Sequence, residues 1–550
     1  MSAIPDKASA EKTPVLIAGA GPVGLALAGD LGWRGLSCIV IEKGDGGIAQ
    51  PKMDLLGVRT MEFCRRWGIV DWVENAGYQR DHEQDCVWVS ALSGGYEFGR
   101  ECFPRPCDEV PPPQSPQHRE RQPQNFFDPV IARFAKSFSN VAVRYHTELL
   151  EFEEHADGVR ARVKDLKSGE ISVIESAYLA GCDGGGSVVR QQLGIPLPQN
   201  AVLTYTTNAV FRCNNLWELQ DKEPGYRFIF IGPEGTWATI VAVNGRDQYR
   251  FSYVGDGNKK ALDENEIRSA IVRAVGREFE FEILSLLPWI RREYVADSYG
   301  TERVFLVGDA AHLNSPTGAF GMNTGMQDAV DLGWKLEAAL RGWAGPKLLA
   351  SYGIERRPVA LRNVKEATAN LKRMMSTRDK KPAKEVFERG PAGDDARKAF
   401  GAEYTEMMRQ EWFTLGIHLG YWYENSPVIV PDGTPPPPDE VMNYTQTARP
   451  GSRAPHVWLA PGKSTLDYFG KRFVLLRFSR HVDVEPLLAA ARAVNMPLEL
   501  VEIRHADALR AYGRLLVLVR PDGHVAWRAD SIPDNSYNII NILRGDPSIS

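Results

Sequence analysis

Three glycines near the start of the sequence have the spacing of a turn that binds phosphate. Gly19, Gly21 and Gly24, with Pro22 after the second, form a G-x-G-x-x-G pattern. In this pattern the first glycine permits a tight turn, the second lets the backbone approach a pyrophosphate, and the third lets a helix pack closely on a strand. Free N–H groups at the helix start favour the phosphate, and Glu42 ends the next expected strand, where its carboxylate can accept ribose hydroxyls. The pattern predicts a bound dinucleotide, either FAD or NAD.

A second carboxylate, Asp309, follows the apolar run at 304–307 in the sequence VFLVGDAAH. Ligands of α/β sheets bind beyond the carboxyl ends of the strands, so we expect Asp309 to accept from a ribityl or ribose hydroxyl. The turn PTGAFGMN then leads into an expected helix at 324–340. The positive end of that helix would stabilise negative charge on the N1–C2=O edge of a flavin. These features favour FAD.

The elements that position these residues are expected to form an α/β fold. Residues 15–18 and 38–41 are short buried strands, and the apolar helix at 22–32 joins them into a βαβ unit. Apolar runs at 177–180 and 304–307 end in glycine-rich turns. Since these segments lie far apart in the sequence, we expect one sheet to be assembled from distant parts of the chain.

A different pattern occupies residues 204–253, where short runs rich in Val, Ile, Phe, Tyr and Thr alternate with turn sequences. This pattern is typical of antiparallel strands and predicts a sheet inserted into the nucleotide-binding domain. Helical periodicity follows at 322–343 and 364–412. The proline run at 435–438 then marks a stiff linker before a last unit that contains no cysteine.

Composition restricts the class of protein. The 550 residues are 43% hydrophobic and 25% charged, which excludes a disordered chain or a coiled coil. The net charge of −5 gives no indication of nucleic-acid binding and favours a small-molecule ligand. Seven cysteines without a C-x-x-C pair argue against a disulfide framework and against a metal site of zinc-ribbon type. With no signal-like N-terminus and no apolar run of about 18 residues, the expected location is the cytoplasm, with no membrane partner.

Several motifs occur in the order seen in one flavoprotein family. They are GAGPVG, Cys182-Asp183-Gly184 with Ser187 and Arg190, the GDAAH block with GMNTGMQDAVDLGWKL, SYGIERRPVA, RPGSRAPHVWL and LVLVRPDGHVAWR. The chain resembles the single-component FAD-dependent aromatic hydroxylases (group A flavoprotein monooxygenases), in particular the phenol-hydroxylase-like branch with a C-terminal thioredoxin-like domain. The expected domains are an FAD-binding domain (1–200 and 296–375), a substrate-binding β-sheet domain (201–295), a helical segment with the linker (376–448) and a thioredoxin-like domain lacking cysteines (449–550).

The resemblance implies a role for individual residues. Gly19, Gly21, Pro22, Gly24 and Glu42 would hold the ADP half of FAD, and Asp309 the ribityl side. The backbone at Gly321, Met322 and Asn323 would face the pyrimidine edge of the flavin, Gln124 would contact the cofactor, and Asp183-Gly184 would serve both FAD and NAD(P)H with Arg190 as a partner. Relatives often have an arginine where this chain has Lys52, which keeps the charge but loses the planar fork.

The reaction implied is reduction of FAD by NADH or NADPH, capture of O2 as a flavin C4a-hydroperoxide, and transfer of its terminal hydroxyl to a phenolic ring. The expected setting is aromatic catabolism by a homodimer, with possible loss of a nitro or halide substituent. Two alternatives are an FAD-dependent epoxidase or halogenase and a non-catalytic nucleotide-binding protein. The halogenase signature W-x-W-x-I-P is absent.

Asp54 is the candidate base that withdraws the phenol proton, directly or through a water or a tyrosine, and Tyr226 is the tyrosine considered. The alternative is that Asp54 only caps a helix that begins near Leu55. His312 is expected to be a packed histidine, because no second ligand stands at metal-binding spacing. The pairs Arg291-Arg292 and Arg356-Arg357 are expected to be solvated charge clusters.

Overall fold

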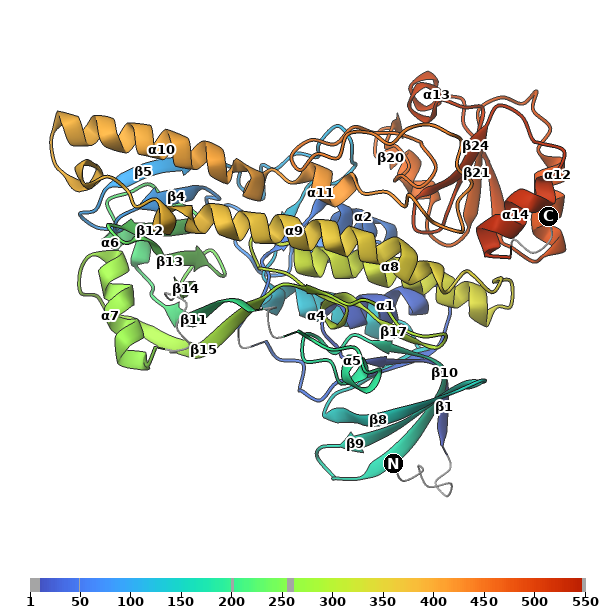
Figure 1. Cartoon of the computed structure of the whole chain (residues 1–550), viewed down its shortest axis with the longest axis horizontal. Coiled ribbons are helices and arrows are strands. Elements are labelled where there is room, and N and C mark those ends of the chain that lie inside the picture. Colours follow the sequence, from blue (N-terminus) through green and yellow to red (C-terminus); the bar gives the residue numbers. More distant parts are fainter. Residues whose placement is uncertain (1–9, 49, 199–201, 255–261, 547–550) are drawn as a thin grey trace.

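The computed structural model describes residues 10–48, 50–198, 202–254 and 262–546. Two seven-stranded sheets and a four-stranded C-terminal sheet form the framework, and long helices run between them (Figure 1). The boundary expected at 200/201 lies outside the described residues. Within the described residues, no helix has the length and apolar character needed to cross a membrane.

The first sheet is assembled from distant segments, as the sequence predicted. Its strands lie in the order β7-β2-β1-β10-β9-β8, and β17 also pairs with β10. The central pairs are parallel, which places Ile17 of β1 beside Val40 of β2 and Ala180 of β10. The strands are β1 (Glu11–Ala18), β2 (Cys38–Ile41), β7 (Val141–Arg144), β8 (Thr147–His155), β9 (Gly158–Asp165), β10 (Ile171–Gly181) and β17 (Val304–Leu306).

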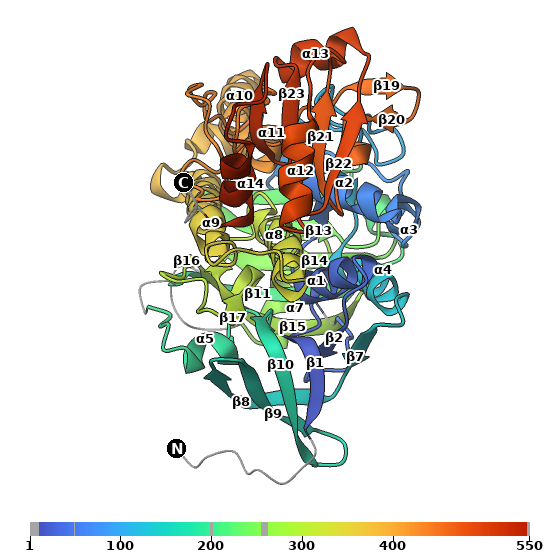
Figure 2. The ribbon, with the colours of Figure 1, turned by 90° about the vertical axis from the view of Figure 1, so that its right-hand side faces the viewer.

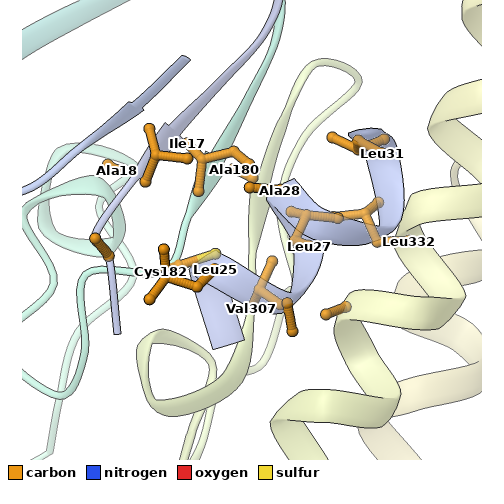
Figure 3. Close-up of a cluster of buried hydrophobic side chains, with 14 of the residues drawn as sticks. Ile17, Ala18, Leu25, Leu27, Ala28, Leu31, Ala180, Cys182, Val307 and Leu332 are labelled. Atoms are coloured by element: carbon orange, nitrogen blue, oxygen red, sulfur yellow. The ribbon is translucent and has the colours of Figure 1, made fainter. Parts of the chain in front are cut away.

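Helices cover this sheet, so the side chains of its central strands are buried and the strands are continuously apolar. α1 (Pro22–Trp33) is buried on nearly all sides because it lies between the sheet and α8 (Phe320–Leu340). Figure 3 shows Leu25, Leu27, Ala28 and Leu31 of α1 among side chains from the strands and Leu332 of α8. α4 (Gln124–Lys136) and α9 (Ser351–Asp379) pack on α1 and α8, respectively.

The second sheet has the order β15-β11-β14-β13-β12-β4-β5. The predicted inserted segment supplies β11 to β15, and β4 and β5 join from residues that the sequence grouped with the FAD-binding domain. α10 (Pro391–Trp412) lies along β5. The strands are β4 (Cys86–Val89), β5 (Glu97–Glu101), β11 (Val202–Arg212), β12 (Arg227–Gly232), β13 (Gly235–Ala242), β14 (Gln248–Val254) and β15 (Glu282–Arg292), and α7 (Glu264–Val275) follows β14.

The C-terminal unit has the mixed sheet β22-β21-β23-β24, the arrangement of a thioredoxin-like domain. It packs directly on the first domain: Trp334 of α8 lies with ring centroids 5.7 Å from Phe473, and the views in Figures 1 and 2 place this unit beside α8 and α2. Its elements are β21 (Phe473–Arg477), α12 (Glu485–Ala493), β22 (Leu498–Glu502), α13 (Ala506–Tyr512), β23 (Leu516–Val519), β24 (Val525–Ala529) and α14 (Ser536–Arg544).

Short elements complete the connections. They are β3 (Leu55–Leu56), α2 (Val58–Trp67), α3 (Val70–Glu74), β6 (Glu120–Arg121), α5 (Val188–Gln192), α6 (Leu216–Leu219), β16 (Tyr294–Val295), the 3-10 turn η2 (Gly308–Ala310), β18 (His312–Leu313), a second 3-10 turn η3 (Lys384–Phe387), α11 (Leu415–Leu419), β19 (Trp458–Ala460), β20 (Lys463–Ser464) and a third 3-10 turn η4 (Thr465–Tyr468).

Candidate active site

The glycine-rich turn joins β1 to α1, and a side chain would be excluded or exposed for a different steric reason at each of its three glycines. Gly19 has a φ of +105°, and a Cβ there would lie 2.4 Å from the carbonyl oxygen of Cys182. A Cβ on Gly24 would lie 2.0 Å from the carbonyl oxygen of Gly19. A Cβ on Gly21 would meet no protein atom within 4 Å, so the backbone there is open to a ligand. Close packing at two glycines and an open side at the third fit a bound pyrophosphate, and Pro22 begins the helix at no cost in hydrogen bonds.

Glu42 lies against this turn. Its carboxylate accepts hydrogen bonds from the backbone N–H groups of Ala20, at 3.0 Å, and Gly44, at 2.7 Å. A carboxylate has about four acceptor sites, so two bonds leave capacity for ribose hydroxyls. The position therefore fits the predicted contact with the ADP half of FAD.

The Asp183-Gly184 turn and the Asp309 turn are held together by Arg190. Arg190 is 2% exposed and donates hydrogen bonds to the carbonyl oxygens of Gly185, at 2.9 Å, and Ala310, at 3.2 Å. Asp183 accepts from the backbone N–H of Val189, while its second carboxylate oxygen is buried without a partner. Since Arg190 lies beneath both turns, any effect on a bound nucleotide passes through their backbone.

Asp309 comes directly after β17 and is close to the start of α8. Its side chain is exposed, and a Cβ on Gly321 would lie 3.9 Å from its carboxylate. The first N–H groups of α8, which include those of Gly321 and Met322, have no acceptor within the helix. Partial desolvation by the neighbouring protein atoms raises the pKa of the Asp309 carboxyl. A carboxylate beside a helix N-terminus provides the acceptor and donors that a ribityl chain and a flavin edge require.

The side chain of Asn323 is committed to the protein. Its Oδ1 accepts from the N–H of Gly57 at 2.8 Å and from the hydroxyl of Thr60 at 2.7 Å. Its Nδ2 donates to the carbonyl oxygens of Leu55, at 3.0 Å, and Ala319, at 2.7 Å. Asn323 therefore fixes the start of α8 against the segment that carries Asp54, and only its backbone is available to a flavin.

Lys52 and Gln124 meet on the other side of that segment. The side-chain oxygen of Gln124 accepts from the backbone N–H of Lys52 at 3.1 Å, and its amide nitrogen donates to Asp128 at 3.0 Å. Gln124 is buried, whereas Lys52 is exposed, with its Nζ 5.9 Å from the centroid of the Trp289 ring. Gln124 thus positions the backbone of Lys52, whose side chain forms no ion pair with any residue that the structure describes.

A cavity of about 1250 Å³, its open mouth included, lies between the two domains. One wall is the segment from Gln50 to Leu55 together with the loop at 316–319 before α8. The facing wall is one side of the second sheet, since Asn208, Ser252 and Thr239 are register partners on adjacent strands and all line the cavity. The cavity therefore joins the start of α8 to the sheet predicted to bind substrate.

Asp54 and Tyr226 meet in this cavity. The Tyr226 hydroxyl donates a hydrogen bond to the Asp54 carboxylate. Arg121 and Arg250 each place a guanidinium nitrogen 3.3 Å from that carboxylate, and the Arg121 guanidinium also lies 3.6 Å from the centroid of the Tyr226 ring. The structure thus brings together both sequence-predicted catalytic residues.

The two arginines determine the ionisation of this group. Burial acts to raise the pKa of the Asp54 carboxyl, but the charges of Arg121 and Arg250 outweigh it and lower that pKa below its ordinary value. Burial and the Asp54 charge raise the pKa of Tyr226 well above its ordinary value. At neutral pH the pair is a carboxylate that accepts from a protonated phenol.

Two interpretations of the sequence are wrong. Asp54 does not cap a helix, because α2 begins at Val58 after Gly57 and the Asp54 side chain points to Tyr226. Two of the four arginines expected to be solvated are buried. Arg356 is 0% exposed and donates to Asp328 at 2.8 Å, and Arg291 is 7% exposed. His312 is buried as expected, 2.8 Å from Asp328.

Sequence reasoning missed Arg121 and Arg250. Arg121 lies on β6, which pairs with β3 directly after Asp54, and Arg250 reaches from β14 to both Asp54 and the carbonyl oxygen of Pro51. Neither residue belongs to a motif. The only available signal was the alternation of Arg250 with Tyr249 and Phe251 in a predicted strand, which indicates opposite faces.

Comparisons with known proteins show the family of this chain. An FAD-binding-domain family model matches residues 12–367, and an "aromatic-ring hydroxylase, C-terminal" model matches residues 447–539. The FAD-dependent monooxygenase apdD of Emericella nidulans is 30% identical over 94% of this chain and 88% of its own length. The 2,4-dichlorophenol 6-monooxygenase of Delftia acidovorans is 29% identical over 95% of this chain and 96% of its own. RebC, solved with bound 7-carboxy-K252c, is 38% identical with a TM-score of 0.90, covering 98% of this chain and 100% of that one.

The chain belongs to the single-component FAD-dependent aromatic hydroxylases. It is an enzyme with FAD as its cofactor, which excludes the non-catalytic alternative and places it among monooxygenases.

Proposed function

We propose that this enzyme hydroxylates a phenolic aromatic compound with O2 and NADH or NADPH. The observation that carries the proposal is the Tyr226–Asp54 hydrogen bond inside the cavity between the glycine-rich nucleotide site and the second sheet. When bound, FAD supplies reduction by a nicotinamide and transfer of one oxygen atom from O2. The protein supplies orientation of the ring and exclusion of water.

Tyr226 is the group that contacts the substrate phenol, and Asp54 acts through it. A phenol has a pKa of about 10, by analogy with tyrosine, whereas the pKa of Asp54 is lowered from its ordinary value. Complete transfer of the phenol proton to Asp54 is therefore uphill. The pair instead accepts a hydrogen bond from the substrate through Tyr226, while Arg121 and Arg250 stabilise negative charge that develops on the phenol oxygen.

The substrate class is proposed from the relatives and not from the size of the cavity, whose volume of about 1250 Å³ includes its open mouth. Relatives support two settings: the Delftia enzyme is named for a chlorinated phenol, a Burkholderia relative is a 4-methyl-5-nitrocatechol 5-monooxygenase, and RebC is described as a rebeccamycin biosynthetic enzyme. We propose aromatic catabolism as the setting. Release of chloride or nitrite from the ring would distinguish it from a biosynthetic hydroxylation.

The Asp183-Gly184 turn is the proposed contact for NAD(P)H. Gly184 has a φ of +77°, and a Cβ on it would meet no atom within 4 Å, so the outer side of the turn is open to a ligand. Arg190 positions this turn from below.

We also propose a homodimer. β15 is an edge strand of the second sheet, and Leu284, Leu287 and Ile290 on it are exposed. Exposed apolar edge strands are usually covered by another chain or element. A monomeric mass in solution would exclude this assembly.

The function is tested with the purified holoenzyme. We expect a yellow protein that oxidises NADH or NADPH faster when a phenol is added, with a product heavier by one oxygen atom. A protein that neither retains nor binds FAD, or that oxidises the nicotinamide to give only hydrogen peroxide with every phenol, would contradict the proposal.

A further inference from the structure

A second cavity lies between α2 and the C-terminal unit, which Figure 2 shows side by side. Its volume is about 670 Å³, its open mouth included, and among the described residues it shares no lining residue with the substrate cavity. Arg59, Arg65 and Arg66 of α2 form one wall, and Phe469 and Gly523 of the C-terminal unit belong to the other. A ligand in this cavity would contact two domains at once.

Arg66 is a cation without an acidic partner in this cavity. The residue is partly exposed, but its Nη1 atom is buried, and among the described residues it has neither a hydrogen-bond partner nor an ion pair. Arg59 approaches the same turn, because a Cβ placed on Gly523 would lie 3.3 Å from Nη2 of each arginine. The Nε atom of Arg59 is also buried without a partner. Two guanidinium groups with unsatisfied N–H donors therefore converge on the turn of Gly523.

Both acids that line the cavity are held by other arginines. Asp467 accepts from Nε and Nη2 of Arg65, at 2.7 and 2.9 Å. Glu62 accepts from Arg59 at 2.7 Å and from Arg453 at 3.0 Å. The three lining arginines thus exceed the two lining acids, and the excess charge lies on the arginine that has no ion pair.

Two carboxylates outside the cavity wall, Asp30 and Asp522, also act on Arg66 through their charge. Each is paired with another arginine: Asp30 with Arg34 at 2.7 Å, and Asp522 with Arg520 at 2.7 Å. Burial and the neighbouring arginines outweigh these two acids and lower the pKa of Arg66 to about 10, so its guanidinium stays charged at pH 7. A buried cation among other cations favours an anion as its partner.

The surroundings hold Arg66 in place and leave room for the rest of a ligand. A Cβ on Gly470 would lie 3.3 Å from Cδ of Arg66, so the missing side chain there makes space for the arginine stem. Trp33 lines the cavity, and Nζ of Lys471 lies 4.6 Å from the centroid of its ring, which adds positive charge beside this wall. A guanidinium that is fixed by packing loses little freedom when it binds an anion.

We propose that this cavity binds the phosphate group of a small metabolite, with Arg66 as its main partner and Arg59 as the second. A phosphate monoester carries a charge of about −1.5 to −2 at pH 7 and has three acceptor oxygens, so it can accept from two arginines. A carboxylate has one charge and matches a single arginine fork. The inference does not depend on the proposed function, because the two cavities are separate.

The test measures binding of inorganic phosphate to the FAD-loaded holoenzyme, in which the cofactor occupies the glycine-rich turn. Equilibrium dialysis is done at pH 7.5 with chloride exchanged for phosphate at constant ionic strength. We expect one phosphate per chain with a Kd of about 1 mM or below. The absence of binding up to about 10 mM phosphate would overturn the proposal.

Variants locate the bound ion. Arg66→Gln should raise the Kd for phosphate about tenfold or more, and Arg66→Lys should restore part of the affinity because it keeps the charge but not the planar fork. The matched control is Arg133→Gln, which removes the same charge from an exposed arginine on α4 that does not line the cavity. Flavin content and Tm establish that each variant is folded. An equal Kd in Arg66→Gln and in the control would place the phosphate elsewhere and overturn the proposal.

Hydrogen exchange of the unaltered holoenzyme tests the site even if Arg66→Gln does not fold. Phosphate should slow amide exchange in α2 and at 465–469, on both sides of the cavity, because a ligand that joins two elements stabilises both. Protection confined to the turn at 183–186 would assign the phosphate to the proposed nicotinamide site, and the inference would be wrong.

Acetate separates the two kinds of oxyanion. At the same ionic strength we expect acetate to bind about tenfold or more weakly than phosphate, since it offers one charge to two arginines. If acetate binds as tightly as phosphate and with the same dependence on Arg66, the cavity takes a carboxylate and the phosphate assignment is wrong.

Discussion

Tyr226 donates its hydroxyl hydrogen to Asp54 across 172 residues of sequence. Asp54 directly precedes β3 and Tyr226 directly precedes β12, and these two strands belong to different sheets. This hydrogen bond joins the FAD-binding domain to the second sheet, and the proposed function assigns each of the two side chains a part in activity.

The first prediction concerns this pair. Tyr226→Phe removes the hydroxyl that we propose contacts the phenol, and Asp54→Asn removes the charge that accepts its hydrogen bond. Each should lower hydroxylation by about 10² or more and increase hydrogen peroxide release, because a positioned acid–base group contributes about 10²–10⁴ in rate. Product and peroxide are measured per NAD(P)H consumed.

Flavin content is the control for these variants, since neither side chain contacts the glycine-rich turn. If Asp54 helps to ionise the phenol, raising the pH toward the phenol pKa should restore part of the activity of Asp54→Asn. Normal coupling in both variants at neutral pH would remove the pair from the mechanism.

The second prediction separates two glycines of one motif. Gly21 has φ −72° and ψ 177°, which alanine adopts readily, and its missing side chain faces open space. Gly21→Ala should therefore fold normally but raise the Kd for FAD about tenfold or more. Gly24→Ala forces a Cβ to 2.0 Å from the Gly19 carbonyl oxygen and should destabilise the protein itself by about 1–3 kcal/mol.

Reconstitution of both apoproteins with FAD, together with thermal melting, distinguishes these effects. Unchanged FAD affinity in Gly21→Ala would mean that the cofactor does not approach the backbone at this residue.

The third prediction is that the buried Arg190 controls cofactor retention through the backbone of the two turns that it supports. Arg190→Ala leaves the carbonyl oxygens of Gly185 and Ala310 without their donor, so both turns lose their common support. We expect a soluble protein that loses FAD on gel filtration. Gln192→Ala is the matched control, because Gln192 is exposed on the same helix α5 and its side-chain hydrogen bonds go to Phe152 and Leu150 of β8 and not to either turn. Retention of FAD equal to that of the control would contradict this role.

The parts of the fold that local sequence specifies were predictable. The turn with Gly19, Gly21 and Gly24 lies within one βαβ unit, so its spacing alone determines its geometry. The burial of Arg291 was not predictable, because it depends on the pairing of β15 with β11 and on a cavity wall from residues 50–55. Arg356 was misassigned for the same reason: its partner Asp328 lies on another helix, and a pair of adjacent arginines gives no indication of such a partner.

The last prediction concerns pH and the contact between the first domain and the C-terminal unit. The Glu62 carboxylate on α2 accepts a hydrogen bond from Nε of Arg453 at 3.0 Å and one from Arg59 at 2.7 Å. Burial opposes ionisation of the Glu62 carboxyl, but the two arginines lower its pKa to about 2. A carboxyl with a lowered pKa in the folded state stabilises that state above its unfolded pKa, and the contribution is lost as pH falls toward the folded value.

Glu62→Gln should therefore lower the free energy of unfolding by about 3 kcal/mol at pH 7, since each pKa unit corresponds to about 1.4 kcal/mol. The difference from the unaltered protein should narrow as pH falls below about 4.5, where the unfolded carboxyl is protonated. Urea unfolding at pH 7 and at pH 3.5 measures both values. Glu485→Gln is the control: its ion pair with Arg492 is largely exposed on both sides and should contribute little at either pH. A Glu62→Gln effect that stays the same at both pH values would show that the contact stabilises the domains through packing and not through the charge.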